Sequence, residues 1–140
     1  MSSPVAIYIR NLRVQTGLTQ LDLAGLMGYE QAYVSAIELG IKSPSDEFIA
    51  KLIIALKLGT KDQEEIGLAL KDSKRRYTLP PEVSTKTYLF CSAFWERIEH
   101  LHPALLDAMY EMLKAGDKVA ERPIYRPTRV RRQSKREAPM

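Results

Sequence analysis

The stretch that decides the fold is residues 20–39, which read QLDLAGLMGYEQAYVSAIEL. Gly28 divides this stretch into two segments of helical length, and glycine can adopt the left-handed turn that most residues avoid. Ala24 is small enough to let two helices cross closely. Three residues fall at the spacing of an inward-facing apolar stripe: Leu23, Val34 and Ile37. The stretch therefore predicts two short helices joined by a tight turn, which is the helix-turn-helix arrangement.

Two pairs of polar residues mark where neighbouring helices begin. Thr19 with Asp22, and Thr60 with Gln63, have the spacing of a capping box, in which two side chains and two backbone N–H groups satisfy one another. These pairs predict helices that begin at about residues 20 and 60.

Turn residues and apolar spacing indicate the other helices of this region. Pro4 suits the first position of a helix that ends at Gly17, and residues 43–45 (SPS) open another helix that ends at Gly59. Apolar residues recur every three or four positions throughout, and the breaks carry turn residues rather than strand signals. We therefore expect residues 1–70 to form an all-α domain of five short helices.

The remainder of the chain divides into a linker, a helical segment and a tail. Residues 71–83, KDSKRRYTLPPEV, combine a basic cluster with two adjacent prolines and are expected to be a linker. Residues 84–116 follow, with Ser84 as a cap, and Pro103 interrupts them, so that either two helices meet near His102 or one helix is kinked. The apolar stripe of this segment contains Phe90, Phe94, Ile98, Leu101, Leu105 and Met109.

This stripe has two interpretations. It packs back on the N-terminal bundle as additional core, or it forms a dimer interface, because exposed stripes of aromatic and apolar residues require a partner. We favour a homodimer in which Phe94 and Ile98 are buried across the two-fold axis.

The positive charge of the chain is concentrated at its C-terminal end. The whole chain has a formal net charge of +4, yet residues 1–73 hold seven Lys or Arg against nine Asp or Glu. Residues 118–140 hold eight Lys or Arg against two Glu. Residues 117–140 are expected to be a flexible basic tail, either a solubilising end or an arm that binds polyanions.

Several classes of function are excluded or disfavoured by composition. The single cysteine, Cys91, allows neither an internal disulfide nor a zinc ribbon, and no phosphate-binding glycine loop is present. Glu96, Glu99, His100 and His102 are a weak metal-like cluster and more simply a solvated surface. With no apolar run of about 20 residues and no signal-like start, we expect a cytoplasmic protein with no membrane span, no cofactor and no enzymatic activity.

The stretches NLRVQTGLTQ, AIELG and KSPS give this region a resemblance to the lambda-repressor-like, or XRE/Cro-type, helix-turn-helix family. The resemblance covers roughly residues 4–58. In that family the second helix crosses the phosphate backbone and the third enters the major groove of double-stranded DNA.

The resemblance implies which residues of this chain would meet DNA. Residues at the start of the third helix would face the bases, and others would approach phosphates. The implied set is Gln20, Gln31, Ala32, Tyr33, Ser35, Ala36 and Lys42. Gln31 is the sharpest candidate, since its amide can bond N6 and N7 of adenine together. Two of these residues have an alternative role without DNA contact. Gln20 would cap or solvate its helix, and the Tyr33 ring would pack along the protein surface.

The family also implies a structural role for two charged residues. Arg13 and Glu38 occupy positions that commonly form an internal ion pair between the first and third helices. One departure from the family pattern lies just before the third helix, where Tyr29 and Glu30 replace the usual short polar cap.

These observations predict a sequence-specific DNA-binding transcriptional regulator, a repressor that binds an inverted-repeat operator as a dimer. The alternative is an antitoxin-like or adaptor protein that grips a protein partner through residues 84–116. Because residues 1–73 are net acidic, the basic tail or the Lys74 to Arg76 cluster would supply nonspecific attraction to phosphates.

Overall fold

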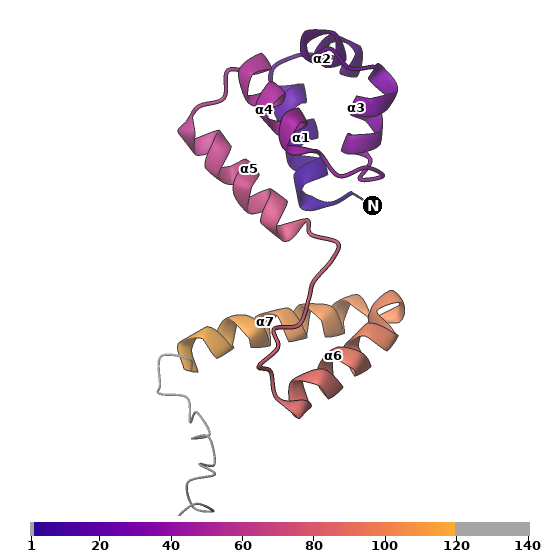
Figure 1. Cartoon of the computed structure of the whole chain (residues 1–140), viewed down its shortest axis with the longest axis vertical. Helices are drawn as coiled ribbons and strands as arrows, with labels where there is room; N and C mark the ends of the chain where they lie inside the picture. Colours follow the sequence, from indigo (N-terminus) through magenta and orange to yellow (C-terminus); the bar gives the residue numbers. More distant parts are fainter. Residues whose placement is uncertain (1, 120–140) are drawn as a thin grey trace, which may run out of the picture. The chain divides into compact units, whose positions relative to one another are not determined.

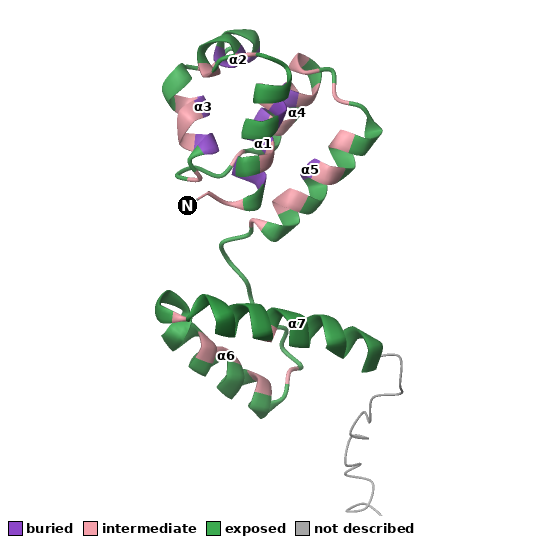
Figure 2. Ribbon diagram, turned by 180° about the vertical axis from the view of Figure 1, so that it is seen from behind, coloured by how far each residue is buried: buried purple, intermediate pink, exposed green. Residues whose placement is uncertain are grey.

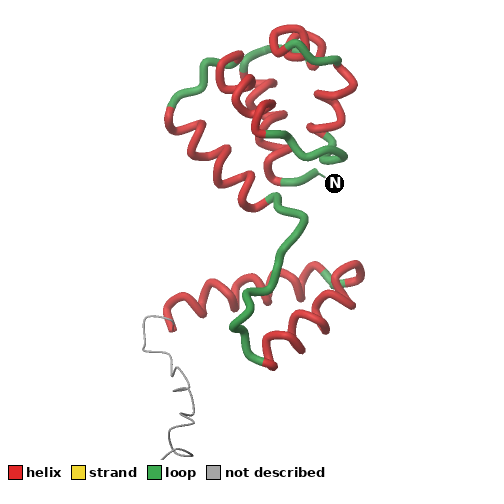
Figure 3. The backbone as a smooth tube through the Cα atoms, in the orientation of Figure 1, coloured by secondary structure: helices red, strands yellow, loops and turns green. Residues whose placement is uncertain are grey.

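The computed structural model of the chain describes residues 2–119, and this part contains helices and loops but no strand (Figure 3). The chain divides after Leu79 into two compact units. Within the described residues, no helix has the length and apolar character needed to cross a bilayer. The expected all-α class is confirmed.

The first unit contains the five helices that the sequence predicts (Figure 1). They are α1 (Pro4–Gln15), α2 (Gln20–Met27), α3 (Gln31–Glu38), α4 (Asp46–Ala55) and α5 (Thr60–Asp72). Helix α1 packs against α3 and α5, while α2 packs against α3 and α4.

The core of this unit is built by at least one fully buried side chain from every helix (Figure 2). The largest of these are Ile9, Leu23, Ile37, Phe48, Leu52 and Ile66. Removing such a side chain from water contributes about 1.5 to 3 kcal/mol. The apolar spacing read from the sequence thus corresponds to the faces that the helices turn toward one another.

Side-chain caps fix the start of the second helix as the sequence predicts. The hydroxyl of Thr19 accepts a hydrogen bond from the backbone N–H of Asp22 at 3.1 Å, and the Asp22 carboxylate accepts one from the N–H of Thr19 at 3.0 Å. The hydrogen bond from the Thr19 backbone also lowers the pKa of Asp22. Ser3 and Ser45 cap α1 and α4 in the simpler way, through one hydroxyl each.

The second predicted capping box, Thr60 with Gln63, is wrong. Gly59 is the N-cap of α5 and provides no side-chain bond, so Thr60 is already the first helical residue. Gln63 instead reaches back and donates from Nε2 to the carbonyl oxygen of Leu58 at 3.0 Å. Lys57 adopts a left-handed conformation (φ 51°) that ends α4, and α5 begins three residues later at Thr60.

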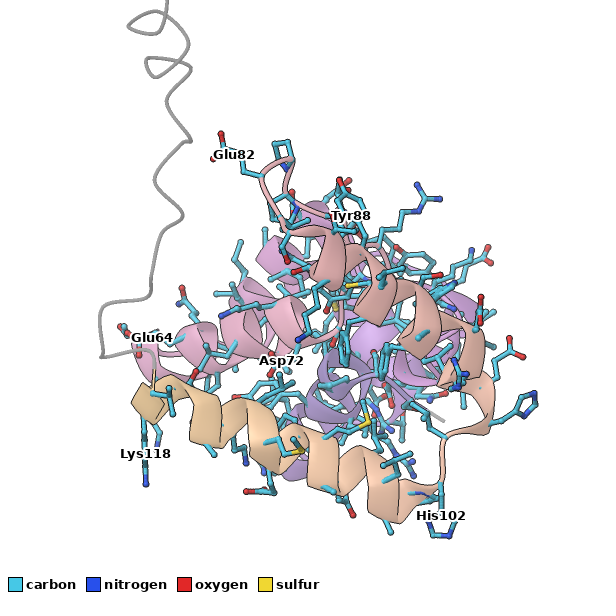
Figure 4. All side chains as sticks on the ribbon, turned by 90° about the horizontal axis from the view of Figure 1, so that it is seen from below. Glu64, Asp72, Glu82, Tyr88, His102 and Lys118 are labelled. Carbon is cyan, nitrogen blue, oxygen red and sulfur yellow. The ribbon has the colours of Figure 1, made fainter. Side chains whose placement is uncertain are left out.

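The second unit consists of two helices, which resolves the alternatives left open at Pro103. Helix α6 (Thr85–Arg97) is capped by the Ser84 hydroxyl, and a 3-10 turn, η1 (Ile98–His100), follows it. Pro103 is the first residue of α7 (Pro103–Val119), and His102 and Lys118 mark the two ends of this helix in Figure 4. No residue of these three elements is buried (Figure 2).

Two helix ends extend beyond the expected boundaries. Helix α5 continues to Asp72, inside the expected linker of residues 71–83, and α7 continues to Val119 rather than ending at residue 116. Residues 117–119 contain no helix breaker, and Lys118 suits the negative end of a helix dipole. The rest of the expected basic tail, residues 120–140, lies outside the described residues.

The contrast between Thr19 and Thr60 gives a matched test of capping. Thr19→Ala should lower the free energy of unfolding by about 1 kcal/mol, because the Asp22 N–H loses its partner. Thr60→Ala should change it by less than about 0.5 kcal/mol, since this exposed threonine makes no cap bond. Urea denaturation followed by circular dichroism measures both, and equal losses would contradict the assignment of caps.

Candidate nucleic-acid interface

Helices α2 and α3 are joined by a tight turn at Gly28. This residue has φ +75°, and the N–H of Tyr29 donates to the carbonyl oxygen of Ala24 at 2.9 Å. A side chain at this φ would be strained, which explains the glycine. The residues predicted to lie between the helices, Leu23, Ala24, Val34 and Ile37, are all buried.

The amino end of α3 is open to solvent. Glu30, Gln31 and Ala32 are exposed, while Ser35 and Ala36, on the following turn, are half-buried. The N-cap Glu30 makes no side-chain hydrogen bond, in agreement with the unsuitability of this residue as a cap. A short helix with an exposed leading turn is the shape that can enter the major groove of DNA.

Tyr33 is packed against the body of the domain. Its ring centroid lies 4.9 Å from that of Tyr29 and 5.8 Å from that of Phe48, a fully buried residue. The Lys42 ammonium lies 5.4 Å from the Tyr33 centroid, and that of Lys51 lies 4.7 Å from the Tyr29 centroid. The structure thus places the Tyr33 ring in the packing arrangement that the sequence left as an alternative.

The aromatic cluster of Tyr29, Tyr33 and Phe48 was not predicted from the sequence. A signal was present, since Tyr29 directly precedes the N-cap of α3, and an apolar residue at that position often packs against the first turns of the helix. Phe48 comes from another helix, so its part in the cluster depends on tertiary packing.

An ion pair joins α1 to α3, as the family resemblance implies. The Arg13 guanidinium donates to Glu38 through two nitrogens: Nε lies 2.9 Å from Oε2, and Nη2 lies 2.9 Å from Oε1. Its remaining nitrogen, Nη1, donates to the Leu18 carbonyl oxygen at 2.9 Å. The Glu38 side chain is 2% exposed and that of Arg13 is 13% exposed. The hydrogen bonds to Glu38 raise the pKa of Arg13.

Gln20 adds to this ion pair from the start of α2. Its Nε2 lies 3.4 Å from Oε1 of Glu38, and its side chain is half-buried. The first residue of α2 is therefore held against the last residue of α3. Lys42, the remaining residue of the implied set, is exposed in the loop after α3.

The weak metal-like cluster of the sequence is not assembled into a site. Among residues 2–119, no three His, Cys, Asp or Glu side chains are grouped as metal ligands. Cys91 is half-buried on α6.

Comparison with protein families identifies the first unit. Residues 9–62 match the family described as helix-turn-helix. This match supports the resemblance of these residues to lambda-repressor-like helix-turn-helix domains. Neither the curated proteins nor the solved structures gave a match to the chain. The helix-turn-helix domain is a DNA-binding module of regulatory proteins, so the match supports a DNA-binding regulator.

The ion pair predicts unequal effects of removing its two partners. Arg13→Ala leaves the almost fully buried Glu38 carboxylate unpaired and should cost about 3 to 5 kcal/mol of unfolding free energy. Glu38→Ala should cost less, because Arg13 lies nearer the surface and keeps its bond to the Leu18 carbonyl.

Urea denaturation of the two variants tests this order. Glu47→Ala is the control, since Glu47 pairs with Lys51 at 3.0 Å on the surface and such pairs contribute less than about 1 kcal/mol. A loss for Arg13→Ala no larger than that of the control would show that the pair does not brace the domain.

Proposed function

We propose that the chain is a sequence-specific transcriptional repressor that binds an inverted-repeat operator as a dimer. The observation that carries the proposal is the exposed leading turn of α3, set on a helix whose other end is fixed by the Arg13–Glu38 pair. Such a helix can enter a groove without reorganisation. A repressor needs only to occupy its site, so this module and a means of dimerisation are sufficient.

The exposed side chains suggest how the bases are read. Gln31 would accept from N6 and donate to N7 of adenine, and Ala32 and Ala36 would contact thymine methyl groups. Ser35 and Lys42 would bond phosphates or bases and set the position of α3 on the duplex. From the start of α2, Gln20 would contact the phosphate backbone of the duplex.

Tyr33 has a different part in this proposal. Because its ring is packed on Tyr29 and Phe48, it would support the first turn of α3, and its hydroxyl would be its only means of reaching a phosphate. Lys42, placed near that ring, would hold the loop after α3 close to the duplex backbone.

Dimerisation is proposed for the second unit because that unit has no core of its own. Helices α6 and α7 bury no residue, and Trp95, Tyr110 and Leu113 are each more than half exposed. An apolar groove of about 470 Å³ lies between the helices. It is lined by Phe90, Phe94, Leu106, Met109, Tyr110, Met112 and Leu113.

This groove differs in part from the expected dimer interface. Phe90, Phe94 and Met109 line it, and the rings of Phe90 and Phe94 stack with centroids 6.2 Å apart. Ile98, Leu101 and Leu105 lie near the bend or on the flank of α7 and do not line it. A pair of isolated helices is marginal in water, and a second copy would bury both apolar grooves at once.

The alternative function is also supported by this groove. A protein partner with an apolar helix would cover the same residues, as expected of an antitoxin-like or adaptor protein. DNA binding would then regulate the chain's own expression. The two functions differ in the oligomeric state of the purified chain.

The first test concerns base reading by Gln31. A pool of random duplexes is enriched by binding to the full chain, and affinity for the selected sequence is measured by fluorescence anisotropy. Gln31→Ala should weaken this affinity about 5- to 150-fold, the equivalent of about 1 to 3 kcal/mol, with little change for unselected duplexes.

Gln15→Ala is the matched control for this test. Gln15 is exposed at the end of α1, beside the carboxylates of Asp62 and Glu65, where DNA would be repelled. The control should retain wild-type affinity. Failure of the wild-type chain to enrich any sequence would overturn the proposed function.

The second test concerns the dimer. The full chain should sediment as a dimer at micromolar concentrations, and its selected operator should contain two half-sites about 34 Å apart along the duplex. Phe94→Asp should convert the chain to a monomer, because a carboxylate cannot be buried without a partner. Ser92→Asp, exposed on another face of α6, should leave the dimer intact.

A wild-type monomer at tens of micromolar would contradict the dimer. If the chain then bound a neighbouring gene product in a fixed ratio, and Phe94→Asp abolished this complex, the partner-binding alternative would replace it.

A further inference from the structure

A second hollow lies in the first unit, next to the loop that follows α3. It is a groove of about 730 Å³ bordered by the start of α1, the α3–α4 loop and the chain that leaves α5. Ser3 and Pro4 contribute from α1, Lys42 from the loop, and residues 72–76 from the end of α5. We call it the basic groove.

Hydrogen bonds fix the chain segments that border the basic groove. The hydroxyl of Ser73 donates to the Ala69 carbonyl and accepts from the backbone N–H of Val5 at 2.9 Å. The hydroxyl of Ser2 donates to the carbonyl oxygen of Glu38 at 3.1 Å. Ser73 is thereby held at the start of α1, and Ser2 is held at the carboxyl end of α3.

The groove collects cations that have no carboxylate partner within the described residues. Four basic side chains line it, Lys42, Lys74, Arg75 and Arg76, against one carboxylate, that of Asp72. The salt bridges formed by residues 2–119 include none of these four. By contrast, the cations of Arg13 and Lys51 are neutralised by Glu38 and Glu47.

The charge of the groove comes from side chains rather than from the end of α1. Pro4 has no N–H, and the N–H groups of Val5 and Ala6 already donate to Ser73 and Ser3. A ligand would therefore meet three adjacent exposed side chains and Lys42. This arrangement favours an extended polyanion over a single small anion, because no enclosed set of donors converges on one point.

We propose that the basic groove binds phosphates of the DNA backbone that flank the bases read by α3. Lys42 connects the two surfaces, since its ammonium lies near the Tyr33 ring of α3 while the same residue lines the groove. The inference rests on the proposed DNA binding and adds a contact surface to it. It also assigns to Lys74, Arg75 and Arg76 the nonspecific attraction that the net acidic residues 1–73 lack.

The test uses the full chain with Lys74, Arg75 and Arg76 all changed to Gln. Three exposed cations on α5 and the preceding loop, Lys57, Lys61 and Lys71, changed to Gln give a control with the same loss of charge. Affinities for the selected duplex and for a scrambled duplex are measured by anisotropy from 50 to 200 mM salt, conditions in which counterion release is resolved. Thermal unfolding verifies that both variants are folded.

Each phosphate contact contributes about 0.9 to the slope of log affinity against log salt. The groove variant should therefore lose about 2 to 3 from this slope, with both duplexes weakened alike and the preference for the selected sequence unchanged. The control variant should lose less than about 1 from the same slope. An unchanged slope, or one reduced equally in the two variants, would overturn the inference even where Gln31→Ala supports base reading.

Pyrophosphate serves as a probe for a small-anion site. We expect no saturable binding of pyrophosphate at micromolar concentrations by isothermal titration calorimetry. Saturable binding that the groove variant loses, together with an unchanged salt slope, would assign the groove to a free anion and overturn the DNA contact.

Discussion

The ion pair between Arg13 and Glu38 is the interaction on which the rest of the first unit depends. A carboxylate that is 2% exposed is stable only when its oxygens are satisfied, and Arg13 and Gln20 satisfy them. The pair joins three helices at one point: α1 supplies the guanidinium, α2 the amide and α3 the carboxylate. Because Glu38 is the last residue of α3, fixing it aims the opposite end of that helix outward, where Gln31 is exposed.

The two units solve the problem of burying apolar surface in different ways. The first unit buries a core of its own that includes Phe48 and Leu52, although other apolar residues such as Ile54 stay exposed on its surface. The second unit leaves aromatic and aliphatic residues such as Trp95 and Leu113 in contact with water. A surface of that kind is stabilised only by another apolar surface. This difference is consistent with the proposal that the first unit recognises DNA and the second unit mediates assembly.

Most of the fold could be predicted from patterns that act within a few residues of the sequence. The features that were not predicted depend mainly on contacts between distant segments. Gly28, the Thr19 capping box and the apolar spacing act within a few residues, so they could be read directly. The start of α5 could not, because its N-cap is Gly59, which has no side chain to signal a cap. For the site, the exposure of Gln31 and the pairing of Arg13 followed from position in a known motif. The packing of Tyr33 on Phe48, and the position of Lys42 on the same groove as residues 74–76, arise only when distant segments meet.

The bond between Ser73 and Val5 has a consequence for how the protein is made. Helix α1 finds its main partner, α5, only after nearly the whole first unit has been synthesised. Until then its apolar face, including Ile9, lacks the cover that Ile66 provides. Contacts of such large sequence separation form late and slow the folding of a small helical domain. The first unit would thus become stable in one step, when the segment up to residue 73 has left the ribosome.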